Sequence, residues 1–116
     1  MKSLIAIFAC VVLAVTGCSA SGDPATFSGP AKEITVTIAG GSVNPPPGRV
    51  EVAKGQQVKI VVTSDVPDEL HVHGYDMSAG LQPNTPATVE FVADRDGLFE
   101  VETHDSEMQL FQLQVQ

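Results

Sequence analysis

The sequence predicts an all-β fold, a sandwich of two sheets made from short strands. In several short segments apolar residues alternate with polar or small ones, which is typical of strands with one buried face. Clusters of glycine and proline separate these segments, and no segment shows helical periodicity beyond about one turn. We therefore expect an antiparallel sandwich of about seven to eight strands.

The strand pattern recurs along the chain from residue 33 to the end. It is clearest in residues 33–40, EITVTIAG, where isoleucine or valine occupies every second position from Ile34 to Ile38. Residues 44–48, NPPPG, are expected to lie outside any ladder because proline has no N–H to donate. The proline-flanked stretch 77–86 is expected to form a loop. The expected strands are residues 33–40, 49–53, 56–63, 68–76, 87–93, 97–104 and 108–116.

Length and charge narrow the classes of function. The 116 residues are enough for one domain and too few for two. Aspartate and glutamate total 14 against 6 lysines and arginines, a formal net charge of −8. Nucleic-acid binding and electrostatic docking to anionic lipid both need a basic surface, so this balance argues against both. The sequence offers no paired general base or deep pocket, and we do not expect an enzyme.

The first 18 residues have the pattern of a targeting segment. A short start containing Lys2 precedes an apolar run over residues 4–15, which is too short to cross a bilayer and fits a secretory signal. The run ends in residues 15–18, VTGC, which resemble the bacterial lipoprotein box. The resemblance implies a signal peptide at 1–17, cleaved before Cys18, and acylation of Cys18 as a membrane anchor. The alternative is an ordinary signal peptide with a cysteine there by chance.

The two cysteines of the chain are both accounted for by this interpretation. Cys10 leaves with the signal and Cys18 carries the lipid, so the domain has no free thiol, disulfide or thiolate metal ligand. Residues 18–32 are rich in serine, glycine, alanine and proline, and we interpret them as the lipidated cysteine and a flexible tether. Residues 33–116 then form the domain. We expect the protein at the cell membrane, lipid-anchored and facing the periplasm or the extracellular side.

Two of the three histidines lie on one predicted strand. His71 and His73 are two residues apart, so they share one face of the strand with Glu69, while Leu70 and Val72 share the other. If the apolar pair faces the core, the histidines face outward or toward the mouth of the sandwich. If the histidines face inward, they need hydrogen-bond partners, because a buried polar group without one is costly.

A pair of imidazoles with a third histidine elsewhere in the chain is a pattern typical of metal sites. His71, His73 and the distant His104 are nitrogen ligands of the kind that zinc and copper prefer. Met108 adds a thioether that could serve as a weak axial ligand, which favours copper. The alternative is that His71 is a hydrogen-bonded structural residue and His73 is merely exposed.

From residue 37 to residue 115 the chain resembles a small cupredoxin domain of the kind found in bacterial periplasmic proteins and lipoproteins. The resemblance implies a Greek-key β-sandwich and, in the family's blue-copper centres, two histidines, a cysteine and a weak axial ligand. The family's first histidine ligand maps to His71, its second to His104 and its axial methionine to Met108. The segments that carry the resemblance, in family order, are residues 50–55, 58–63, 68–73, 82–91 and 97–101.

The cysteine of a blue-copper centre is missing. By the family's spacing from Gly97 it should fall at or near Thr103, whose hydroxyl stays protonated and cannot replace a thiolate. A normal blue-copper centre is therefore excluded. His71, His104 and Met108 remain in family-like positions, with His73 as an added imidazole, and this set could hold copper.

Two functions follow from these patterns. The first is a membrane-anchored copper-binding protein for storage, delivery or tolerance, with zinc as the alternative metal and Glu69 or Asp105 as its carboxylate ligand. The second is a metal-free interaction module with the same fold, in which the site has degenerated. The partners expected are the membrane, through Cys18, and a metal-handling or envelope protein.

Overall fold

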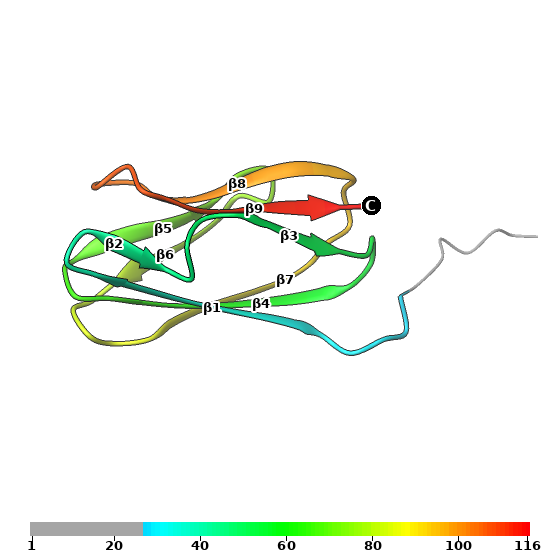
Figure 1. Cartoon of the computed structure of the whole chain (residues 1–116). Helices are drawn as coiled ribbons and strands as arrows, with labels where there is room; N and C mark the ends of the chain where they lie inside the picture. The colour runs from blue at the N-terminus through cyan, green and yellow to red at the C-terminus, as the bar shows by residue number, and fades with distance from the viewer. Residues whose placement is uncertain (1–26) are drawn as a thin grey trace, which may run out of the picture.

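The computed structural model describes residues 27–116 as nine strands in two facing sheets, with no helix among these residues. One sheet has the strand order β2-β1-β4-β7 and the other β3-β9-β8-β5-β6 (Figure 1). The all-β sandwich expected from the sequence is confirmed. The strands are β1 Lys32–Ala39, β2 Ser42–Asn44, β3 Arg49–Val52, β4 Gln57–Ser64, β5 Asp68–Val72, β6 Met77–Leu81, β7 Ala87–Val92, β8 Gly97–Thr103 and β9 Gln109–Val115.

The sandwich is not purely antiparallel as expected. β1 pairs with β4 in parallel, and β3 pairs with β9 in parallel, while the other ladders are antiparallel. The chain changes sheet between β2 and β3 and again between β3 and β4. Because of these crossings, β4 returns beside β1 without a hairpin and runs in the same direction.

The strand count exceeds the expected seven to eight because β6 forms in a stretch expected to be a loop and β2 lies in a segment where no strand was expected. β6 forms where the stretch 77–86 was expected to be a loop, and its Leu81 is 1% exposed. Serine and glycine at alternate positions of β6 hide its periodicity, but its backbone pairs fully with β5. Asn44 pairs with Thr37 as the last residue of β2, so only the residues after it leave the ladder.

The core lies between the sheets and is built from the alternating strands. In β1 and β4 every second residue is buried, as the sequence pattern predicts. The buried apolar side chains are Ile34, Val36, Ile38, Val52, Val58, Ile60, Val62, Leu70, Val72, Leu81, Val89, Ala93, Val101, Leu110, Phe111, Leu113 and Val115.

The sandwich begins one residue before the expected domain boundary, because Lys32 already pairs with Val58. The amide of Gln56 donates to the carbonyl oxygen of Pro30 at 3.1 Å and ties the entering chain to the domain. The predicted signal peptide, Cys10 and Cys18 lie outside the described residues. In the described part of the chain, no helix is long and apolar enough to cross a membrane.

Candidate metal centre

β5 presents its histidine on the outer face of the five-stranded sheet. Leu70 and Val72 are fully buried, whereas Glu69 is exposed and His71 is half-buried. The structure therefore selects the outward orientation of the two that the sequence left open. The strand expected over residues 68–76 ends at Val72, because residues 73–76 form a turn. His73 is the first residue of this turn, and its N–H donates to the carbonyl oxygen of Glu100 at 3.0 Å.

His71, His73 and Glu102 bring three potential metal ligands together on this face. Glu102 on β8 lies directly opposite His71 in the ladder. One ligand atom from each of the three residues lies within 4.8 Å of the other two. Nε2 of His73 is 2.7 Å from Oε1 of Glu102, and the two imidazole rings meet edge to face with centroids 4.5 Å apart. We call these three residues the outer-face centre.

The outer-face centre has the donor set of a copper or zinc site. Imidazole nitrogen and carboxylate oxygen bind zinc at about 2.0–2.2 Å, so ligands of one ion lie within roughly 4 Å of each other. The ligand atoms of the outer-face centre, which lie within 4.8 Å of one another, are close to that spacing. The side chains of His73 and Glu102 are 47% and 38% exposed, so an ion and an exogenous ligand can approach from solvent.

Glu102 was missed by the sequence analysis, which named Glu69 or Asp105 as the carboxylate ligand for zinc. Neither belongs to the outer-face centre, although Glu69 is exposed on the same strand. Asp105 lies in the loop after β8, where its backbone N–H donates to Asp68. Glu102 lies beside His71 because β5 pairs with β8 in this register, and no local sequence signal predicts that register.

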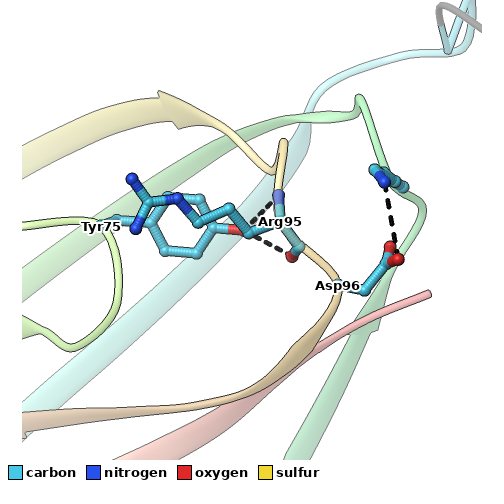
Figure 2. A network of polar contacts seen from close by, with 4 residues as sticks. Tyr75, Arg95 and Asp96 are labelled. Carbon is cyan, nitrogen blue, oxygen red and sulfur yellow. Dashed lines mark hydrogen bonds and ion pairs between the residues drawn. The ribbon is translucent and has the colours of Figure 1, made fainter. Parts of the chain in front are cut away.

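A polar clamp holds the turn that follows His73. The hydroxyl of Tyr75 donates to the carbonyl oxygen of Arg95 at 2.9 Å and accepts from its N–H at 3.3 Å (Figure 2). The Arg95 guanidinium donates to the carbonyl oxygen of Gly74 at 2.6 Å. Burial raises the pKa of Tyr75 above its ordinary value, so its hydroxyl remains a donor at neutral pH.

Packing fixes the same turn from the other side. The ring of Tyr75 packs against Phe91 and Phe99 at centroid distances of 4.6 and 4.9 Å. Gly74 has φ +84°, and a Cβ at this position would overlap the Phe99 ring. His73 lies beyond the strand but is therefore held in place by its neighbours along the chain.

Neither His104 nor Met108 is one of the three residues that form the outer-face centre. His104 is exposed in the loop after β8, where its N–H donates to the carbonyl oxygen of Glu69, and it does not belong to the centre. Met108 packs against the core, whereas His71 lies on the outer face. Metal ligation by His104 and Met108 remains a prediction.

The loop between β8 and β9 is closed by hydrogen bonds at the position where a blue-copper centre has its cysteine. Thr103 is 1% exposed, and its hydroxyl lies 2.8 Å from that of Ser106. The same hydroxyl accepts from the N–H of Met108 at 3.1 Å. Asp68 on β5 accepts from the hydroxyl of Ser106 and, at 2.8 Å, from the N–H of Asp105. We call this arrangement the loop network.

The loop network does not fit an interior copper centre. Burial alone would raise the pKa of Asp68, but hydrogen bonds from Ser106 and from three backbone N–H groups hold it below its ordinary value. Asp68 is thus an ionised carboxylate whose oxygens already accept several hydrogen bonds. Every fully buried side-chain polar atom in the described residues has a hydrogen-bond partner. The polar side chains of the loop network are therefore paired with one another, whereas those of His73 and Glu102 are accessible to solvent.

Comparison with known proteins shows the fold. No protein-family model matches the chain, and no curated protein matches it. Among solved structures it is similar to a copper binding protein in the apo form, with a TM-score of 0.59 and 20% identity over 72% of this chain and 86% of that one.

Larger copper proteins contain a similar domain. The match to a multicopper oxidase has a TM-score of 0.60 and 18% identity, covering 76% of this chain and 45% of that one. The match to copper nitrite reductase from Nitrosomonas europaea has a TM-score of 0.57 and 18% identity, covering 73% and 41%. The chain thus spans less than half of either protein. At this identity the likeness establishes the fold, a cupredoxin-like β-sandwich.

Proposed function

We propose that this protein is a membrane-anchored, extracytoplasmic cupredoxin-like lipoprotein that binds Cu(II) through His71, His73 and Glu102. The observation that carries the proposal is the convergence of two imidazoles and one carboxylate within 4.8 Å on the outer face of the five-stranded sheet. Its role would be storage, delivery or tolerance of copper, without catalysis.

The donor set supports copper, with zinc as the alternative. Nitrogen and oxygen ligands suit Cu(II) and Zn(II), and at a given site of this kind Cu(II) generally binds more tightly. The centre contains no sulfur ligand, which argues against a blue-copper spectrum and against preference for Cu(I). Structural neighbours described as a copper binding protein and a copper nitrite reductase are consistent with this proposal.

The anchor is proposed from the sequence at residues 15–18. An acylated Cys18 would place the domain on the outer side of the cytoplasmic membrane or in the periplasm, within reach of a metal-handling or envelope protein. Residues 19–31 would then link the lipid to the first residue of β1, Lys32.

Copper titration of the full-length protein in detergent tests the proposal. We expect one equivalent of Cu(II), and we expect His71→Ala to weaken binding by at least the roughly 10–100-fold that loss of an outer-shell partner costs a metal site. His104→Ala is the matched control and should change affinity by less than about twofold. Absence of stoichiometric binding would contradict the proposal, and an equal loss in His104→Ala would instead support a site that includes His104.

A metal-free interaction module is the second candidate, and the loop network favours it. Hydrogen bonds among Asp68, Thr103 and Ser106 hold the loop together. If this candidate is right, metal analysis of the protein purified from its native envelope finds neither copper nor zinc, and His71→Ala leaves its envelope partners unchanged.

A further inference from the structure

A second glutamate lies beside the outer-face centre but is not part of it. Val72 pairs with Val101, and the N–H of His73 donates to the carbonyl oxygen of Glu100, so Glu100 lies opposite His73. Glu100 and Glu102 alternate with the buried Val101 and therefore both face outward. His73 thus has one glutamate opposite and another diagonally across, and only Glu102 belongs to the centre.

Two glutamines on β9 donate hydrogen bonds to the carboxylate of Glu100. The amide of Gln112 donates to Oε1 at 2.8 Å, and the amide of Gln109 donates to Oε2. β9 and β5 lie on opposite sides of β8 in the sheet. The glutamines therefore orient Glu100 toward β9, away from the histidines on β5, whereas Glu102 contacts His73.

We propose that Gln109 and Gln112 determine the metal specificity of the outer-face centre by keeping Glu100 out of the ligand set. Two imidazoles with one carboxylate suit copper and zinc, whereas a second carboxylate would add negative charge and oxygen ligands, which favour manganese, calcium and magnesium. This inference rests on the proposed function, because it concerns the same centre.

Titration with Cu(II) and with Mn(II) tests the inference on the full-length protein in detergent. In Gln109→Ala/Gln112→Ala the affinity for Mn(II) should rise about tenfold, the scale on which outer-shell residues change metal affinity. Adding Glu100→Gln to this double variant should cancel the gain. Gln114→Ala is the matched control, because Gln114 also lies on β9 but donates to Gln116 instead of Glu100.

Glu100→Gln alone keeps the test independent of how well the double variant folds. It should leave Cu(II) affinity unchanged, whereas Glu102→Gln should weaken it about tenfold or more. The inference is overturned if Glu100→Gln weakens Cu(II) binding as much as Glu102→Gln, or if the folded double variant gains no Mn(II) affinity. Failure of the proposed function is distinct, since the unmodified protein would then bind no Cu(II).

Discussion

The outer-face centre and the loop network use the same two strands, β5 and β8, in opposite ways. Asp68 and Thr103 point inward and have their hydrogen-bonding capacity met by the loop between β8 and β9. His71 and Glu102, each one residue from a buried neighbour, point outward and remain accessible. The inward-facing polar residues of these strands are held in a hydrogen-bond network, and the solvent-facing side of the same sheet carries imidazole and carboxylate groups.

The largest expected effect is a loss of stability when the loop network is disrupted. Asp68→Ala removes a buried carboxylate and leaves the N–H of Asp105 and the hydroxyl of Ser106 without their acceptor, which should lower the free energy of unfolding by about 3 kcal/mol. Urea unfolding measures this change. Cu(II) affinity, measured at a temperature where the variant is folded, should stay within about twofold of the unmodified protein. A loss like that of His71→Ala would show that the two regions are one site.

Acid should weaken the loop network in a way that depends on Asp68. Its pKa in the folded protein lies below the ordinary value of 3.8, so the ionised carboxylate stabilises the fold at and above that pH. This contribution is lost as the pH falls from the unfolded-state pKa toward the folded-state pKa. We expect the free energy of unfolding to decline below about pH 4 more steeply in the unmodified protein than in Asp68→Asn. Parallel curves for the two proteins would contradict the role given to Asp68.

The smallest effect is expected at the clamp beside His73. Tyr75→Phe keeps the ring packed between Phe91 and Phe99 but removes both hydrogen bonds to Arg95, which should cost about 1 kcal/mol of unfolding free energy. Cu(II) affinity should fall by less than about fivefold, because the N–H of His73 still donates to Glu100. Thermal unfolding and copper titration measure the two quantities. A copper affinity lost as completely as in His71→Ala would show that the clamp, and not the hydrogen bond to Glu100, holds His73 in place.

The sequence predicts the sandwich well because its main strands carry their own signal. The alternation in β1 and β4 reports which face is buried without knowledge of any partner strand. β6 escapes prediction because its serine and glycine depart from the usual strand composition, and its conformation depends on pairing with β5. The parallel pairings of β1 with β4 and of β3 with β9 could not be predicted, because they depend on which sheet each strand joins.

The candidate site, like the fold, has one part that the sequence predicts and one part that depends on strand pairing. The spacing of His71 and His73 predicts that they lie together, and the structure confirms this, although β5 ends at Val72 and His73 belongs to the turn that follows. Glu102 could not be identified, because its place beside His71 depends on the register between two strands separated by more than twenty residues. The resemblance to cupredoxins pointed to His104 and Met108, whose metal ligation remains a prediction. The hydrogen bonds that Asp68 and Thr103 make with the loop between β8 and β9 depend on tertiary contacts that no local pattern reports.

The two ends of the sandwich have different surroundings if the chain is anchored upstream of Lys32. The backbone of Lys54 donates to the carbonyl oxygen of Gln116, and β1 begins beside β4 at the same end, so the chain enters and leaves the sandwich there (Figure 1). The loop between β8 and β9 lies at the opposite end, next to Glu102 and His71. If that end faces the bilayer, the end next to the outer-face centre would project into the aqueous compartment, where a soluble partner could reach it without approaching the lipid surface.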